Sequence, residues 1–103
     1  MTLQSGNHLA DLKILANYQQ KQRRTVLFRV TIARAENQVE VTYRAMQADG
    51  KTTVTGEPVL RQIGIGKLAL WESFGYIKVV TGSLKQRTST IRLTESGMEI
   101  AAS

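Results

Sequence analysis

The chain has 103 residues, of which 42% are hydrophobic, 21% are charged and one is proline. These figures fit one compact domain over residues 1–103, and they exclude a multidomain enzyme and a collagen-like or low-complexity chain. Lysine and arginine number 14 against 8 acidic residues, which gives a formal net charge of +6. A charge of this sign favours an acidic or polyanionic partner over a cationic one.

Cysteine is absent from the sequence, which excludes disulfides, thiolate metal sites and cysteine nucleophiles. No apolar run approaches the ~20 residues that a membrane-spanning helix needs. The first residues also lack the basic start and the apolar stretch of a signal peptide. We therefore expect a cytoplasmic protein that has no membrane partner.

Residues 7–22 carry the pattern of an amphipathic helix. Its apolar side repeats at helical spacing through Leu9, Leu12, Leu15 and Ala16. Asn7 is placed to cap the N-terminus. Three cations follow at the C-terminal end, namely Lys21, Arg23 and Arg24. Positive charge there interacts favourably with the helix dipole, and the same side chains form a candidate basic patch for an anion.

The apolar period then changes from 3.6 to 2, which is typical of strands. Alternation over residues 26–32 and again over residues 39–45 predicts a hairpin whose turn is centred immediately after Ala35. Such a turn places Ile32 opposite Val39. Burial of the apolar side chains on one face sets this register.

A central helix is predicted over residues 58–74, because Pro58 suits the first turn and the following apolar residues share one side. Gly64 and Gly66 each oppose a continuous helix by about 1 kcal/mol relative to alanine. A break near these two residues is therefore an open alternative. Gly75 is expected to end the helix.

Two more hairpin signals complete the chain. Asp49-Gly50 predicts a tight turn that leads into a short strand at residues 52–55. After the central helix, alternation predicts a hairpin with strands at 76–81 and 88–93, and a short closing helix is expected at residues 95–102. The predicted class is α+β, with an N-terminal helix, a three-stranded antiparallel meander, a central helix and a C-terminal β-hairpin. This order is typical of an OB-like, partly open barrel.

The register of the C-terminal hairpin follows from its apolar residues. Placing them on one face centres the pairing on Lys85, with Val79 opposite Ile91 and Ile77 opposite Leu93. The other face of the hairpin is then fixed as well.

That other face is basic. It carries Tyr76 and sets Lys78 directly across from Arg92, while the loop holds Lys85 and Arg87. No acidic residue accompanies the four cations within the hairpin, so they predict a surface that holds phosphates. Tyr76 is a candidate for stacking on a base. Solvated cations neutralised by an acid distant in sequence are the alternative interpretation.

The segments Leu70–Ile77 and Arg92–Gly97 resemble two parts of one known family. The first is similar to the end of a recognition helix that enters a wing strand, and the second to the corner between wing and helix. Within residues 68–102 the chain thus resembles winged-helix DNA-binding regulators of the MarR and PadR kind. The resemblance implies a winged-helix-like end, with Arg87 as the wing arginine that reaches the minor groove.

Little in the sequence points to an enzyme. The only histidine, His8, is expected at the start of the first helix in a surface or capping role. Residues 64–69 match the pattern G-x-G-x-x-A, which can place a pyrophosphate at a helix N-terminus, but residues 60–63 do not form a convincing strand before it. Two acidic pairs are too poor in ligands to predict a metal, namely Glu36 with Glu40 and Glu95 with Glu99. We expect no cofactor.

The sequence therefore predicts a small non-enzymatic protein that binds DNA or RNA, with a transcriptional regulator as one form of this function. The expected phosphate-holding residues are those of the C-terminal hairpin, with the basic end of the first helix as a second patch. An adaptor or small subunit that docks on an acidic protein surface is the alternative, because basic charge serves both classes. An edge strand or the first helix is a candidate contact for a homodimer.

Overall fold

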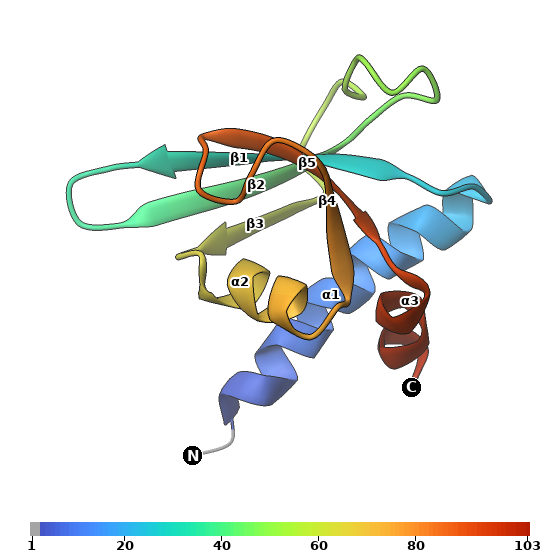
Figure 1. Cartoon of the computed structure of the whole chain (residues 1–103), viewed down its shortest axis with the longest axis horizontal. Helices are drawn as coiled ribbons and strands as arrows, with labels where there is room; N and C mark the ends of the chain where they lie inside the picture. The colour runs from blue at the N-terminus through green and yellow to red at the C-terminus, as the bar shows by residue number, and fades with distance from the viewer. Residues whose placement is uncertain (1–2) are drawn as a thin grey trace.

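The computed structural model describes residues 3–103, with the side chains of residues 8–103. Three helices and five strands follow one another along this part of the chain (Figure 1). They are α1 (Leu3–Gln22), β1 (Leu27–Arg34), β2 (Val39–Ala45), β3 (Leu60–Ile63), α2 (Gly66–Ser73), β4 (Ile77–Thr81), β5 (Thr88–Leu93) and α3 (Glu95–Ala102). Among these helices, none is both long and apolar enough to cross a membrane.

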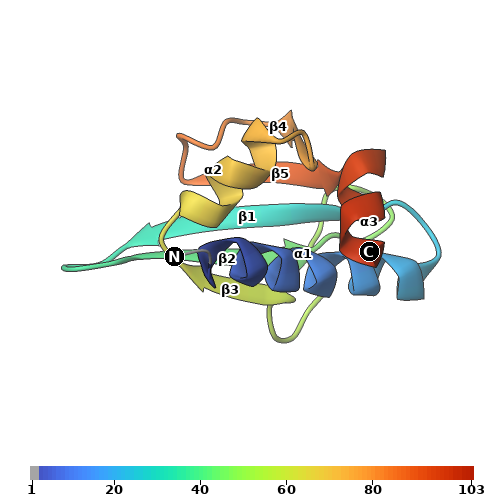
Figure 2. The same ribbon diagram turned by 90° about the horizontal axis from the view of Figure 1, so that it is seen from below.

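All five strands form one antiparallel sheet in the order β3-β2-β1-β5-β4. β1 lies at the centre, where it joins the N-terminal strands to the C-terminal hairpin. The sheet is open, with β3 and β4 at its edges. Figures 1 and 2 show all three helices on the same side of the sheet. The predicted α+β class is thus confirmed, and the unclosed sheet is compatible with the predicted partly open fold.

The core lies between the helices and the face of the sheet that they cover. From the helices, Leu12 and Leu15 of α1 and Trp71 of α2 are fully buried. They pack with Phe28 of β1 and Tyr43 of β2, which belong to the same core cluster. Burial of each large apolar side chain contributes about 1.5–3 kcal/mol. The helix itself begins at Leu3, so the prediction that Asn7 caps its start was wrong.

The first hairpin has the predicted strands but a different register. Ile32 pairs with Val41 rather than with Val39. The amide of Ala35 donates to the carbonyl of Gln38 at 2.9 Å, so the turn is centred one residue later than predicted. Because the register differs by two residues, each side chain keeps its predicted face.

The segment between β2 and β3 is mostly irregular. The turn at Asp49-Gly50 is confirmed, because the Gly50 amide donates to the carbonyl of Gln47 at 2.9 Å. The predicted strand at residues 52–55 was wrong, since only an isolated bridge between Met46 and Thr53 forms there. The third strand of the meander is instead β3.

Residues 58–74 do not form one continuous helix, and the alternative of a break near Gly64 and Gly66 is confirmed. Residues 60–63 form β3, and only the second half of the segment forms α2. Gly64 has a φ of +84°, a left-handed conformation that interrupts the chain between the two elements. Gly75, with a φ of 76°, follows the end of α2 as predicted.

The C-terminal hairpin and closing helix match their predictions closely. Ile77 pairs with Leu93, and Val79 pairs with Ile91. A bulge then follows on β4 between Val79 and Thr81. Because of it, Thr81 rather than Val80 pairs with Thr90 of β5. The predicted helix over residues 95–102 is α3.

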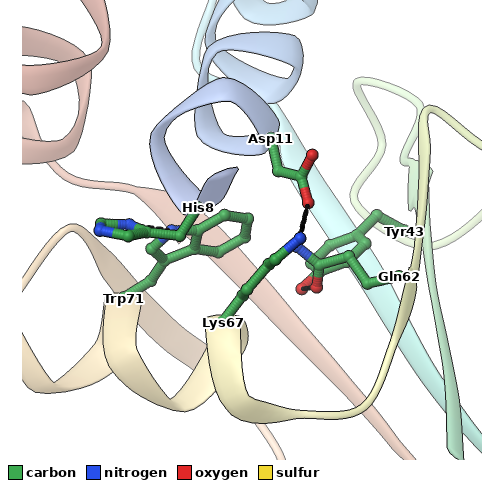
Figure 3. A network of polar contacts seen from close by, with 6 residues as sticks. All are labelled: His8, Asp11, Tyr43, Gln62, Lys67 and Trp71. Carbon is green, nitrogen blue, oxygen red and sulfur yellow. Dashed lines mark hydrogen bonds and ion pairs between the residues drawn. The ribbon is translucent and has the colours of Figure 1, made fainter. Parts of the chain in front are cut away.

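A polar network joins α1 to the sheet and to α2 (Figure 3). The Oδ2 atom of Asp11 accepts hydrogen bonds from Gln62 at 3.0 Å and from Lys67 at 3.1 Å. The Oε1 atom of Gln62 accepts from the hydroxyl of Tyr43 at 2.6 Å. Burial raises the pKa of Tyr43 far above its usual range, and the charge of Asp11 adds to the rise. These groups satisfy one another, which is what a partly buried polar cluster requires.

His8 belongs to the same junction between α1 and α2. It is 5% exposed, and its Nδ1 atom accepts a hydrogen bond from the indole Nε1 of Trp71 at 3.3 Å. Its ring centroid lies 6.3 Å from that of Phe74. The prediction of a surface or capping role was therefore wrong, because α1 begins five residues before His8 and carries it into the core.

Candidate nucleic-acid interface

The face of the sheet opposite the helices is called the open face here. Side chains alternate between the two faces of a strand, and the residues between the core positions point to the open face. In the part of the chain that the structure describes, no helix covers this face (Figures 1 and 2). The pairing of the strands places on it Leu27, Arg29, Thr31, Ala33, Glu40, Thr42, Arg44, Arg61, Ile63, Lys78, Thr81, Thr88, Thr90 and Arg92.

Four cations on the open face come from four adjacent strands. They are Arg44 of β2, Arg29 of β1, Arg92 of β5 and Lys78 of β4, and together they form the sheet-face cluster. Arg29 lies directly opposite Arg44, and Lys78 directly opposite Arg92. Because Arg92 pairs with the residue two positions before Arg29, these two arginines are diagonal neighbours, about 7–8 Å apart. The predicted opposition of Lys78 and Arg92 is confirmed.

Among the described residues, no ion pair joins an acidic side chain to the sheet-face cluster. Glu40 is the only acidic residue at the strand positions of the open face that the structure describes. It is four residues from Arg44 along β2, about 13 Å at the usual rise per residue. The ion pairs among the described residues join Arg61 to Glu57 and Lys67 to Asp11. None of them includes a member of the cluster.

The side chains of Arg44 and Arg29 are held in different ways. Nη1 of Arg44 donates to the carbonyl of Gly56 at 2.7 Å, so the loop between β2 and β3 fixes this side chain. Nε of Arg29 is buried and has no hydrogen-bond partner among the described residues. A guanidinium has five N–H donors, and both arginines therefore have donors left for an anion on the open face.

A second group of cations, the loop cluster, consists of Arg34, Lys85 and Arg87. With Ile32 and Gln86 these residues line a hollow of about 180 Å³. Ile32 points into the core, away from the open face. The hollow therefore lies at the end of the sheet and not on the open face. The structure thus brings Lys85 and Arg87 next to Arg34 of β1, and not next to the cations at the other end of the hairpin.

Tyr76 is engaged with the core. Its side chain is half-buried and packs against the core cluster. Its ring centroid is 5.4 Å from that of Phe74, which is 53% exposed. Of these two rings, Phe74 is therefore the more accessible to solvent.

The three cations at the end of α1 also have different environments. Lys21 and Arg23 are exposed and line a shallow hollow. Arg23 has a φ of 56° and ends the helix. Arg24 donates to the carbonyls of Thr25 at 3.3 Å and Met46 at 3.2 Å, and so ties the start of β1 to the end of β2. Lys21 and Arg23 are therefore the more accessible of the three.

The glycine-rich pattern at residues 64–69 does follow a strand, β3, contrary to the expectation from the sequence. The sheet is antiparallel, however, whereas the dinucleotide fingerprint belongs to a parallel β-α-β unit. Lys67 is paired with Asp11 rather than free to meet a phosphate. Among the described residues, no group of three or more histidine, aspartate and glutamate side chains is placed to hold a metal ion.

Sequence reasoning missed Arg29, Arg34 and Arg44 as site residues. In the chain they are close to Glu36 and Glu40, which suggested local neutralisation. The alternation of core residues already assigned Arg29 and Arg44 to the face away from the core. The sequence pattern did not reveal that β1 pairs with β5. This pairing places Arg29 and Arg44 on the same face as the cations of the C-terminal hairpin.

No protein-family model, curated protein or solved structure matches the chain. The function is therefore argued from the charge and geometry of the two clusters.

Proposed function

We propose that the chain is a small, cytoplasmic, non-enzymatic nucleic-acid-binding protein whose open face holds phosphates. The observation that carries this proposal is the sheet-face cluster, in which cations from four adjacent strands lie on a face that no helix covers and form no ion pair, as far as the described residues show. Lys and Arg contacts to phosphates supply most of the sequence-independent affinity for nucleic acid. The net charge of +6 acts in the same direction over longer distances.

The shape of the cluster suits an extended polyanion. Neighbouring strands lie about 4.8 Å apart, so four strands spread the cations over about 14 Å. One strand of a duplex advances about 3.4 Å per phosphate along the helix axis, so this width corresponds to several phosphates. The same face also offers hydroxyl groups that can bond to phosphate oxygens, from Thr31, Thr42, Thr81 and Thr88.

The salt dependence of binding gives a quantitative test. Four phosphate contacts predict a slope of log affinity against log salt of about −2.8 for a single strand and about −3.6 for a duplex. The measurement is a polarisation titration with labelled single- and double-stranded oligonucleotides over a range of salt concentrations. Replacing Lys78 or Arg92 with glutamine is expected to reduce the slope by about 0.7–0.9 each.

Lys51 provides the matched control, because it is an exposed lysine in the turn after Asp49 and lies outside both clusters. Lys51→Gln should leave the slope of the wild type nearly unchanged. An unchanged slope in all of the sheet-face variants, or no binding at low salt, would exclude the proposed site.

The same titration distinguishes a duplex-binding regulator, a single-strand-binding protein and an adaptor. A winged-helix regulator, which the C-terminal resemblance favours, is expected to prefer duplex DNA. An open sheet face is expected to prefer single strands. A chain that binds neither, but retains a stoichiometric acidic protein from nuclease-treated extract, would instead be an adaptor.

A further inference from the structure

The hollow beside the β4–β5 loop is a built feature of the fold. The carbonyl of Arg87 accepts a hydrogen bond from the amide of Ile32 at 2.7 Å, which fixes the loop to the central strand. Within the loop, the backbone amide of Gln86 donates to the carbonyl of Ser83 at 3.0 Å, and the backbone amide of Lys85 donates to the hydroxyl of Ser83 at 3.1 Å. The backbone thus holds the lining residues in place without using their charged ends.

Gly82 contributes to this arrangement. Its φ is +77°, and a Cβ atom there would lie 2.9 Å from Oε1 of Gln86 and 3.1 Å from the carbonyl of Thr88. Glycine thus lets the side chain of Gln86 fold against the loop. The side-chain amide of Gln86 adds a neutral polar group to a hollow whose other polar lining residues are cations.

The charge of the lining is of one sign. Arg34, Lys85 and Arg87 are all exposed, and the described residues that line the hollow include no carboxylate. None of the three takes part in the ion pairs among the described residues. Arginine donors match the geometry of a phosphate, and lysine adds a point charge.

The size of the hollow selects a small group. Its volume of about 180 Å³ is below the 300–1,000 Å³ of pockets that enclose a drug-sized ligand. A phosphate monoester carries about −1.5 to −2 charges at pH 7 and has three free acceptor oxygens. An internal phosphate diester continues into chain on both sides, so it fits a flat face better than a hollow.

We propose that the hollow formed by Arg34, Lys85, Gln86 and Arg87 binds a phosphate monoester, as a site separate from the sheet-face cluster. The group has two sources, a free phosphorylated small molecule or the terminal phosphate of a nucleic-acid strand. This site does not depend on the proposed function of the open face, because the two clusters lie on different sides of the sheet.

The experiment is an NMR titration of backbone amides with inorganic phosphate at constant ionic strength. Saturable shifts are expected at residues 32–34 and 85–87. Arg34→Gln and Lys85→Gln should each weaken binding by about tenfold or more, the loss for one hydrogen bond to a charged group. Both variants keep the backbone bond between Arg87 and Ile32, so their spectra should otherwise match that of the wild type.

Two control variants localise the effect. Lys51→Gln removes an exposed lysine elsewhere, and Lys78→Gln removes a member of the sheet-face cluster. Neither should change the affinity for phosphate. Shifts of equal size around all lysines and arginines, or affinity that is unchanged in Arg34→Gln and Lys85→Gln, would overturn the proposal.

Further titrations identify which molecule supplies the phosphate monoester. If the group is a strand end, an oligonucleotide with a terminal phosphate binds more tightly than its hydroxyl counterpart, and Lys85→Gln abolishes the difference. If the source is a small molecule, a nucleoside monophosphate shifts the same amides while the two oligonucleotides bind equally. Phosphate binding without any oligonucleotide binding would leave this site standing and reject the function proposed for the open face.

Discussion

Lys78 of β4 and Arg92 of β5 lie directly opposite each other on the open face. Like charges at such positions destabilise a sheet by about 0.2–1 kcal/mol. Arg29 and Arg44 repeat the same opposition on β1 and β2. Two opposed cation pairs on one face thus act against the stability of the sheet, and a bound polyanion would reverse the sign of both contributions.

Lys78→Glu separates stability from binding. The variant places opposite charges across the β4–β5 ladder, so we expect the free energy of unfolding to rise by up to about 1 kcal/mol at low salt. Affinity for oligonucleotides should fall at the same time. Urea denaturation and polarisation titration measure the two quantities, and Lys51→Glu is the control for charge alone. A variant with lower stability or unchanged affinity would contradict this account of the face.

The hydrogen bond between Tyr43 and Gln62 should couple their contributions to stability. Gln62→Leu leaves a buried hydroxyl without its partner, which costs about 1–3 kcal/mol. Tyr43→Phe leaves the Oε1 atom of Gln62 unpaired in the same way. The double variant should lose less than the sum of the single variants, by about 0.5–3 kcal/mol. The cycle is measured by urea denaturation, and additive losses would show that the bond contributes little.

Tyr43 should also make the fold sensitive to alkaline pH. Its pKa is raised in the folded state, first by burial and then by Asp11, so the folded protein keeps the neutral hydroxyl. The unfolded chain ionises near pH 10. The stabilising contribution is therefore complete below about pH 10 and falls above it, by up to about 1.4 kcal/mol per pH unit.

The measurement is urea denaturation between about pH 8 and pH 11, across the ordinary tyrosine pKa. Tyr43→Phe should be less stable than the wild type near neutrality but should lose less stability as the pH rises. Parallel pH profiles for the two proteins would mean that the hydroxyl of Tyr43 does not control the alkaline transition.

Gly97 should tolerate no side chain. It is buried in α3, and a Cβ atom there would collide with the carbonyl oxygen of Tyr76. Because the obstacle is backbone, Gly97→Ala should lower the free energy of unfolding by at least about 1–3 kcal/mol. Gly66→Ala is the matched control, since no atom lies within 4 Å of the added Cβ. Similar thermal midpoints for both variants would refute this packing argument.

The sequence predicted those parts of the fold in which local pattern and burial agree. The C-terminal hairpin has one apolar face, so the pairing of Val79 with Ile91 followed directly. The segment around β3 offered no such agreement. Leu60 and Ile63 fit one side of a helix, yet in the structure they lie on opposite faces of an edge strand. Pairing with β2 outweighed the local helical pattern there.

The candidate site was predicted only in part for a similar reason. Lys78 and Arg92 belong to one hairpin, so their opposition is a local property. Arg29 and Arg44 join them only through the contact between β1 and β5, which are far apart in sequence. Lys85 and Arg87 lie beyond the paired part of the hairpin, and their position beside Arg34 depends on the same long-range contact.

The bulge of β4 also bears on how the molecule behaves at high concentration. This strand is an edge of the sheet, only five residues long, and its pairing register shifts between Val79 and Thr81. Short length, a bulge and a lysine are the devices by which natural edges resist the addition of a foreign strand. We therefore expect this edge to be a poor template for amyloid-like aggregation.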